Sequence, residues 1–255
     1  MIWVRSLLFT ALLFLSVPVH ATAVMLVSPF GHRACYRVAV NWARVNLWLL
    51  KRLCGLGWTA EGLEHVPAES SVLYCKHQSV LEALVCAVLF PPQCWVAKRE
   101  LLWIPFFGWG LARLKPIAID RKAGRRAVRQ VIAQGQARLA EGLWVVIFPE
   151  GTRVLPGKAR RYGISGAALA RAARKPLLPI AHNAGDYWPR RSFLKHPGTM
   201  RMVIGPPVPT ADRTPEQITR AARQWIEATM ARISPAEAAA AAAGAPPPAE
   251  PINAD

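Results

Sequence analysis

Short apolar runs alternate with helix-like segments through the middle of this chain, and this alternation limits the possible folds more than any other feature. Strands are expected at 71–75, 94–97, 117–119, 144–148 and 177–181. Between them, the spacing of apolar residues predicts helices at 81–89, 124–141 and 164–173. Strands that alternate with helices are joined by crossovers, which favour parallel pairing. The sequence therefore predicts an α/β fold with a mixed, partly parallel sheet flanked by helices.

A last helix is expected after Thr214. Thr214 and Gln217 have the spacing of a capping box, and Pro215 suits the first helical position. Beyond Ile233 the sequence is rich in Ala and Pro, and such a composition cannot bury a core. We therefore expect the α/β domain at 56–233 and a disordered tail at 234–255.

The N-terminal segment from Leu7 to Phe30 has no formally charged residue and is long enough to cross a bilayer. A cleavable secretory signal is the alternative, because Arg5, an apolar run to Val19 and small residues follow one another in the order of such a signal. However, the apolar stretch continues through Val27, and the rest of the chain lacks a disulfide pattern. These features favour a retained membrane anchor at 1–32.

Residues 33–55 interleave basic and apolar side chains, with Trp42 and Trp48 among the apolar ones. This pattern is typical of an amphipathic helix at a membrane surface, where cations meet lipid phosphates. An ordinary packing helix gives the same pattern. Positive charges beside an anchor favour the cytoplasmic side. We therefore expect the inner membrane, with the domain on its cytoplasmic face.

The chain has a formal charge of +17, and most of the excess lies between Ala97 and Arg201, with 21 Lys or Arg against 5 Asp or Glu. Such a field attracts nucleic acid, anionic lipid headgroups or phosphorylated substrates such as CoA esters. The apolar N-terminus and the lack of a nucleic-acid module argue against nucleic acid. The five cysteines show no C-x-x-C spacing, so we expect reduced, buried thiols and no metal site.

His77 follows the first expected strand, and Glu82 comes five residues later. In one continuous helix the two would point about 140° apart, so they can meet only if His77 precedes the helix and Glu82 lies in its first turn. Ser79 as N-cap fits this layout, although a capping box alone also explains Ser79 and Glu82. As a dyad, His77 would take a proton from an alcohol while the carboxylate fixes the ring and stabilises the imidazolium.

The segment Phe148–Arg153 follows a buried strand, at the strand end where open α/β sheets place their ligands. Gly151 permits close approach of the backbone, and Arg153 can bind a phosphate through two parallel hydrogen bonds. A turn with a solvated Arg is the alternative.

Lys98 precedes an aromatic run that contains Trp103, Phe106 and Phe107. Lys98 could meet a phosphate, and the aromatic rings could enter lipid or line an acyl tunnel. Core packing is the simpler interpretation of the rings. The strand at 178–183 has either a structural or a binding role, and Gly163–Ala167 resembles the nucleophile elbow of a hydrolase without its final Gly.

Taken in order, the blocks at 76–82, 97–108, 148–153 and 178–183 resemble the 1-acylglycerol-3-phosphate acyltransferase family. That family has a His-x4-Asp block, a block with Lys and Ile-Pro-Phe-Phe-Gly, a Phe-Pro-Glu-Gly-Thr-Arg block and a late strand with Pro. Ile119–Arg121 also resembles the family's segment between the second and third blocks. The resemblance implies a glycerolipid acyltransferase-like α/β fold preceded by membrane-associated helices.

The resemblance also implies roles for single residues. His77 would be the general base and Glu82 its orienting carboxylate. The residues implied in substrate binding are Lys98, Glu150, Gly151, Thr152 and Arg153. Lys98 and Arg153 would lie around the acceptor phosphate, and Glu150 and Gly151 would shape the same loop. No metal or cofactor is implied. The acyl group would pass from acyl-CoA or acyl-carrier protein, as co-substrate, to the sn-2 hydroxyl of 1-acylglycerol-3-phosphate, a lysophospholipid, giving phosphatidic acid.

Three residues depart from the family pattern. Glu82 stands where Asp is usual, Lys76 where Asn is common, and Val154 where Ser is frequent. These changes preserve acyl transfer but leave the acceptor open, including a lyso-ornithine lipid or another lysolipid. A lipid hydrolase and a non-catalytic protein that binds anionic lipid are the competing interpretations.

Overall fold

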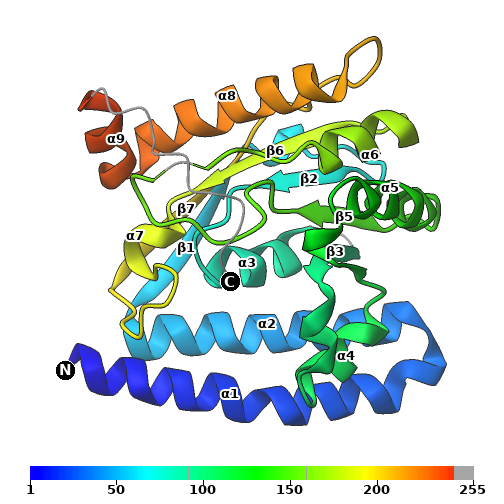
Figure 1. Cartoon of the computed structure of the whole chain (residues 1–255). Coiled ribbons are helices and arrows are strands. Elements are labelled where there is room, and N and C mark those ends of the chain that lie inside the picture. The colour runs from blue at the N-terminus through cyan, green and yellow to red at the C-terminus, as the bar shows by residue number, and fades with distance from the viewer. Residues whose placement is uncertain (91, 159, 244–255) are drawn as a thin grey trace.

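A sheet covered by helices on both faces forms the centre of the molecule (Figure 1). The computed structural model describes residues 1–90, 92–158 and 160–243. The strands are β1 (Leu56–Glu61), β2 (Val72–Cys75), β3 (Gln93–Lys98), β4 (Ile117–Ile119), β5 (Trp144–Ile147), β6 (Leu177–His182) and β7 (Gly198–Ile204). Their order is β1-β7-β6-β2-β5-β3-β4. Neighbours from β6 to β4 are parallel, whereas β7 runs antiparallel to β6 and parallel to β1. The predicted mixed, partly parallel sheet is confirmed.

Helices pack on the two faces of this sheet because strand residues alternate between two cores. The helices are α1 (Ile2–Val27), α2 (His32–Cys54), α3 (Leu81–Leu89), α4 (Phe107–Arg113), α5 (Arg125–Ala140), α6 (Ser165–Ala173), α7 (Ala184–Tyr187), α8 (Pro215–Ile233) and α9 (Pro235–Ala242). Leu73 and Cys75 face the core built with α2 and α3. Val72 and Tyr74 face the core built with α5, α6 and α8. Such alternation is the two-residue period of a strand buried on both faces.

The first two helices form an antiparallel pair beneath the sheet (Figure 1). Trp42 of α2 donates to the Ser16 hydroxyl of α1 at 2.9 Å, and the Cys54 thiol lies 3.7 Å from the Arg5 carbonyl. Helix α2 therefore lies between α1 and the α/β domain, as a packing helix does. The stretch Ile2–Phe30 is long and apolar enough to cross a membrane, but a signal sequence passes the same test.

The C-terminal part of the described chain is more ordered than we expected. The capping box of α8 is present, with Gln217 N–H donating to Thr214 Oγ1 at 3.3 Å and Thr214 N–H donating to Gln217 Oε1 at 2.8 Å. The predicted disorder from 234 onward is wrong for Pro235–Ala242, which form α9 with Ser234 as its cap. Alanine has the highest helix propensity, and the buried Glu237 fixes this helix to the domain. Residues 244–255 of the expected tail lie outside the described residues.

Candidate active site

The predicted site residues gather at one edge of the sheet. His77 follows β2, the segment 148–153 follows β5, and Lys98 ends β3. These three strands are parallel neighbours, so their carboxyl ends lie side by side. The fold therefore brings together three blocks that are far apart in the sequence.

His77 and Glu82 form a hydrogen-bonded pair. His77 Nδ1 lies 2.8 Å from Glu82 Oε1, and the same oxygen accepts the backbone N–H of Gln78 at 3.1 Å and of Ser79 at 2.9 Å. Helix α3 begins at Leu81, so His77 lies in the turn before it, as the spacing required. Ser79 Oγ accepts Leu81 N–H at 3.2 Å. The N-cap of α3 is Val80 and has no side-chain cap bond, so the expected capping box with Ser79 as N-cap is wrong. The Glu82 carboxylate still bonds both the imidazole and the backbone of the turn before the helix.

Burial and stacking fix the orientation of the imidazole. Its ring stacks on Phe148 with the ring centroids 3.9 Å apart. The His77 side chain keeps 18% of its surface exposed, whereas that of Glu82 is fully buried. Since Nδ1 faces the carboxylate, Nε2 is the ring nitrogen left to face a substrate. No described residue hydrogen-bonds Nε2, so the ring is arranged to accept a proton there.

The electrostatics of Glu82 favour an ionised carboxylate. Burial alone would raise the pKa of Glu82, but the imidazoles of His182 and His77 and the Ser79 N–H outweigh it and hold this pKa below its usual range. His182 is itself fully buried, and burial lowers its pKa. Its Nε2 lies 2.7 Å from the Lys76 carbonyl, and its Nδ1 accepts Ala184 N–H at 3.2 Å. Strand β6 therefore supports the turn that carries His77, so the block at 178–183 has a structural role.

The segment after β5 is attached directly to the turn of His77. Val154 N–H donates to the His77 carbonyl at 2.8 Å, and Gly151 adopts a positive φ of 70°. The Arg121 guanidinium donates to the Gly151 carbonyl, and Arg190 donates to the Arg153 carbonyl at 2.6 Å. These bonds hold Thr152 and Arg153, which are partly exposed, beside the dyad.

Glu150 points away from the surface of this segment. Its side chain is fully buried, and Oε1 lies 3.4 Å from Lys76 Nζ. Burial raises the pKa of Glu150 to about 7, although the nearby ammonium acts in the opposite direction. In this arrangement Glu150 shapes the loop from below, and its carboxylate does not face a substrate. The predicted binding roles of Gly151, Thr152, Arg153 and Lys98 stay predictions.

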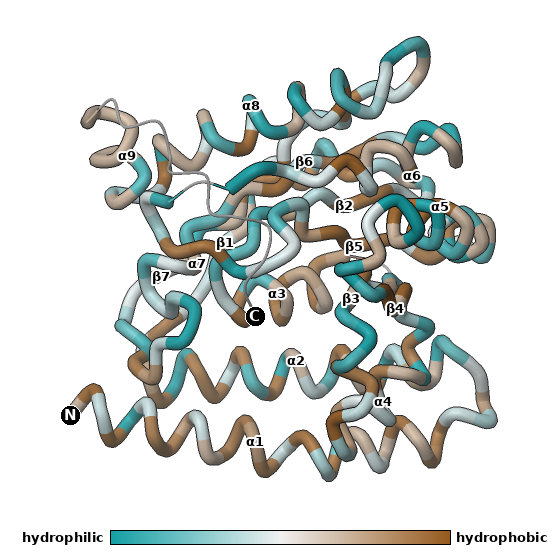
Figure 2. Tube along the Cα trace, in the orientation of Figure 1, coloured by the Kyte–Doolittle hydropathy of each residue, from teal (hydrophilic) through white to brown (hydrophobic). Residues whose placement is uncertain are grey.

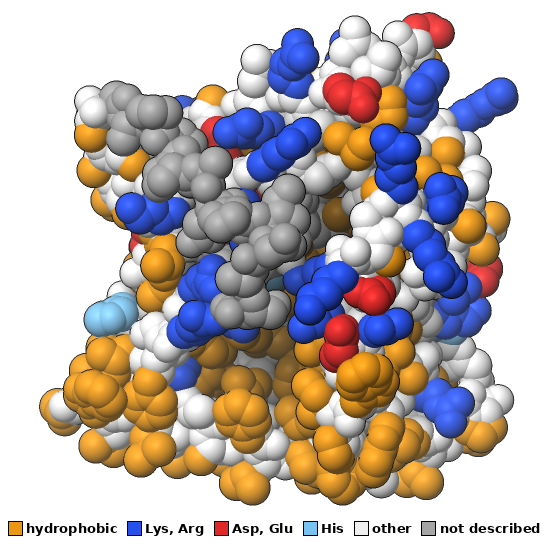
Figure 3. All heavy atoms as spheres, viewed as in Figure 1, with side chains coloured by type: hydrophobic (Ala, Val, Ile, Leu, Met, Phe, Trp, Pro, Cys, Tyr) orange, Lys and Arg blue, Asp and Glu red, His pale blue; other side chains and the backbone are white. Residues whose placement is uncertain are grey.

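The aromatic run after Lys98 does not form part of the core. Trp103 is 69% exposed, and Ile104, Phe106, Phe107 and Trp109 are also exposed. Helix α4 packs on α1, where the backbone of Gly110 approaches Ala21. Hydrophobic side chains gather along the base formed by α1 and α4, and Lys and Arg side chains lie above them (Figure 3). The core-packing interpretation is therefore wrong for these rings.

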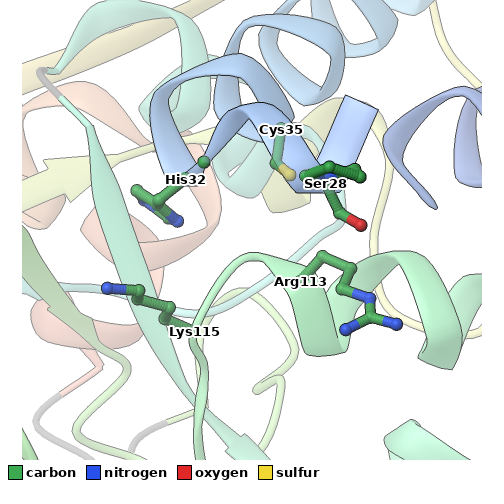
Figure 4. Close-up of a pocket in the computed structure, with 7 residues that line it drawn as sticks. Ser28, His32, Cys35, Arg113 and Lys115 are labelled. Atoms are coloured by element: carbon green, nitrogen blue, oxygen red, sulfur yellow. The ribbon is translucent and has the colours of Figure 1, made fainter. Parts of the chain in front are cut away.

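Three other features are candidates for a site: the metal-ligating side chains, the elbow-like segment and a surface pocket. Among the described residues, no group of His, Cys, Asp and Glu could hold a metal ion, and all five cysteines are buried and free. Ser165 of the elbow-like segment begins α6, and within the described residues its hydroxyl has no hydrogen bond to a histidine, so no triad is formed there. A surface pocket of about 420 Å³ lies at the α1–α2 turn and is lined by Ser28, His32, Cys35, Arg113 and Lys115 among others (Figure 4). It contains no residue of the predicted site.

The tube view shows how the polar turns lie relative to the apolar helices (Figure 2). The segments around β5 and the start of α3 are above the hydrophobic layer of α1 and α2. A site at this edge therefore has an apolar layer on one side and cationic segments on the other.

Comparison with known proteins agrees with this geometry. Residues 58–183 match the model of a family described as Acyltransferase. The 1-acyl-sn-glycerol-3-phosphate acyltransferase of Pseudomonas aeruginosa is 44% identical over 237 residues, which cover 91% of this chain and 92% of that protein. The human 1-acyl-sn-glycerol-3-phosphate acyltransferase alpha is 31% identical over 178 residues, covering 69% of this chain and 63% of the human protein.

A solved structure shares the fold. The crystal structure of the 1-acyl-sn-glycerophosphate (LPA) acyltransferase from Thermotoga maritima superposes with a TM-score of 0.75 at 19% identity. The match covers 90% of this chain and 94% of that one.

Proposed function

The chain belongs to the 1-acyl-sn-glycerol-3-phosphate acyltransferase family, and from this premise we propose that it transfers a fatty acyl group from a thioester to the sn-2 hydroxyl of 1-acylglycerol-3-phosphate. The product would be phosphatidic acid. The observation that carries the proposal is the His77–Glu82 pair at the edge of the sheet, 2.8 Å apart, with the His77 carbonyl bonded to Val154 directly after the segment 148–153. This pair can activate an alcohol without a nucleophilic Ser or Cys.

The proposed step is a direct transfer. His77 Nε2 accepts the proton of the acceptor hydroxyl while the oxygen attacks the thioester carbonyl. The imidazolium that forms is stabilised by the buried Glu82 carboxylate through Nδ1–H. The carbon–sulfur bond then breaks, the thiolate leaves, and the proton on the imidazole returns to it. An ester and a thiol are formed, and the histidine regains its starting state.

Cations near the dyad suit an acceptor with a phosphate group. Lys98 ends β3, Arg153 lies in the segment bonded to His77, and neither has an ion pair with a described residue. Hydrogen bonds between charged partners contribute about 1.5–3 kcal/mol each, enough to select a phosphorylated acceptor. Acyl-CoA and acyl-carrier protein are both suitable donors, because each presents the thioester on a phosphorylated carrier. The chemistry proposed here uses no metal or cofactor.

The apolar base supports a membrane location. Exposed side chains of α1 include Leu7, Phe14 and Leu15, and those of the adjacent run include Trp103 and Phe107. A contiguous exposed apolar surface of this kind is typical of a membrane-binding face. We propose that this base enters one leaflet of the inner membrane from the cytoplasmic side, which places the site near lipid acceptors.

Acyl transfer by the purified protein in mixed micelles tests the proposal. Acyl-CoA and acyl-carrier protein are each incubated with a panel of lysolipids, including lyso-ornithine lipid, while thiol release and product mass are followed. We expect transfer to 1-acylglycerol-3-phosphate. Exclusive transfer to another lysolipid would correct the acceptor, and binding without thiol release would show a lipid-binding protein.

The variant His77→Ala tests the base. Loss of general-base catalysis costs about 10²- to 10⁴-fold in rate, and we expect this loss in protein that still folds, with a lower melting temperature because the buried Glu82 loses a partner. His196→Ala is the matched control, because His196 is exposed. Near-normal turnover by folded His77→Ala protein would reject the assignment.

A further inference from the structure

A buried lysine stands beside the proposed base. Lys76 is fully buried, and its ammonium lies 2.9 Å from Glu227 Oε1 of α8 and 3.4 Å from Glu150 Oε1. Tyr162 also donates its hydroxyl hydrogen to Glu227 Oε1, at 2.9 Å. One side chain therefore connects β2, the segment after β5 and the C-terminal helix α8.

The other neighbour of His77 is held in the same way. Gln78 is buried, and its Nε2 donates to Glu237 Oε1 of α9 at 2.9 Å, while its Oε1 accepts Gly185 N–H at 3.3 Å. His77 thus lies between two residues, each bonded to a carboxylate of a different C-terminal helix. Both carboxylates lie outside residues 58–183, the region that matches the family model.

The buried ammonium needs these carboxylates. An isolated buried charge costs several kcal/mol, so it persists only with partners. Burial acts to lower the pKa of Lys76, but Glu150, Glu227 and Glu237 outweigh it and raise this pKa, so the side chain stays charged. Removing a partner would leave a buried charge without compensation next to the turn of His77.

The backbone of Lys76 transmits its position to the dyad. Its N–H donates to the Ile180 carbonyl at 3.0 Å, and its carbonyl lies 2.7 Å from His182 Nε2. The next residue is His77, whose own carbonyl accepts Val154 N–H from the segment that Glu150 shapes. A shift of the Lys76 side chain would therefore move the imidazole and the segment at 150–153 together.

We propose that Lys76 and Gln78 are positioning residues for acyl transfer, and that α8 and α9 complete the active site by supplying their carboxylate partners, Glu227 and Glu237. This inference rests on the proposed function. The bond from Lys76 to Glu227 sets the position of the dyad relative to the segment at 150–153. The bond from Gln78 to Glu237 holds the other side of the same turn.

Four variants test the Lys76 branch in the full-length protein: Lys76→Met, Glu227→Gln, Glu227→Ala and the double variant Lys76→Met/Glu227→Ala. A misplacement of about 1 Å costs up to about 100-fold in rate, so we expect kcat to fall about 10- to 100-fold in Lys76→Met and Glu227→Ala. The KM for the acceptor should change less than threefold, because neither residue binds it. Glu227→Gln keeps an acceptor oxygen for Lys76 and Tyr162, so it should recover part of kcat.

The double variant should be no slower than Lys76→Met alone, because both changes break the same connection. Lys175 and Glu69 supply the matched control, since they form an exposed ion pair 2.5 Å long elsewhere on the surface. Lys175→Met and Glu69→Gln should leave kcat unchanged. Folded Glu227→Ala protein with wild-type kcat, or effects that multiply in the double variant, would overturn the proposal even if Lys76→Met fails to fold.

Amide hydrogen exchange separates this inference from the proposed function. We expect Glu227→Ala and Glu237→Ala to speed exchange in the peptides 76–82 and 149–155, whereas Glu69→Gln should not. This readout requires no turnover. Lack of transfer to any lysolipid by the wild-type protein would reject the function, whereas unchanged exchange in these peptides would reject the positioning role.

Discussion

The charge of Glu82, beyond its bonds to the turn before α3, is expected to stabilise the transition state. Glu82→Gln removes the charge and preserves the shape of the side chain. Oε1 accepts three N–H groups, whereas Oε2 has no hydrogen-bond partner among the described residues. Glutamine can therefore keep its oxygen toward His77, Gln78 and Ser79 and place its amide nitrogen in the position of Oε2.

The size of the effect follows from the distance in the dyad. Two opposite unit charges 2.8 Å apart attract by about 6 kcal/mol at an effective dielectric constant of roughly 20. A neutral hydrogen bond to the glutamine oxygen keeps about 1 kcal/mol of this. Because the imidazole becomes charged only as the alcohol loses its proton, we expect a transition-state loss of about 3–5 kcal/mol. This corresponds to about 10²- to 10⁴-fold in kcat.

Thiol release at saturating donor and acceptor measures this kcat. Glu64→Gln is the control, because Glu64 is an exposed carboxylate on another surface. Glu82→Gln should also lower stability at pH 7, since the depressed pKa of Glu82 makes its ionised form stabilising above its unfolded pKa of about 4.3. That difference should shrink as the pH falls below about 4. If folded Glu82→Gln protein keeps kcat within threefold of wild type, the charge does not act on the reaction and Glu82 only holds the turn before α3.

Three further predictions concern stability and membrane binding. Burial raises the pKa of Glu150 from 4.5 to about 7, so the folded state holds an extra proton between these pH values, and the free energy of unfolding should fall by about 3 kcal/mol as the pH rises through this window. Glu150→Gln should flatten this slope in denaturant titrations at pH 5 and pH 8. Thr214→Ala removes the capping box of α8 and should lower the free energy of unfolding by about 0.5–2 kcal/mol, whereas an unchanged denaturant midpoint would show that the cap is dispensable. Trp103→Ser with Phe107→Ser should weaken sedimentation with anionic vesicles, whereas Leu63→Ser, at an exposed position outside this base, should not; equal effects would reject the proposed membrane face.

Most elements that surround the site could be predicted because their apolar patterns are local. The helix at 81–89 and the strand at 117–119 have the bounds that the sequence predicted. Helix α5 differs from its predicted bounds by one residue at each end, and α6 by one residue at its start. Strands β1 and β7 were missed. They pair with each other across about 140 residues, and β1 has a weak burial pattern. Alternation at Met200, Met202 and Ile204 is a local sign of β7 that the sequence offered.

The sequence motifs of the site were predictable, but the buried side chains that hold the turn of His77 in place were not. The spacing of His77 and Glu82 was sufficient to place both around the start of a helix. In contrast, the contact between Lys76 and Glu227 joins residues 151 positions apart, and no local pattern indicates it. Glu237 was placed in a tail expected to be disordered, because its alanine-rich surroundings conceal a buried carboxylate. Buried ion pairs depend on tertiary packing, and their partners appear only when the chain has folded.

The N-terminal helix α1 has an outer face and an inner face with different surroundings. Its apolar outer face suits lipid, but its inner face is attached to the domain by Lys195, which is buried in the loop after α7. Lys195 Nζ donates to Thr10 Oγ1 at 2.6 Å, and its backbone N–H donates to Ser6 Oγ at 3.0 Å. Unpairing a buried ammonium would cost several kcal/mol, so the N-terminal part of α1 is held against the domain. A helix fixed in this way suits the proposed anchor along one leaflet, and in that arrangement it would set the height of the dyad above the lipid.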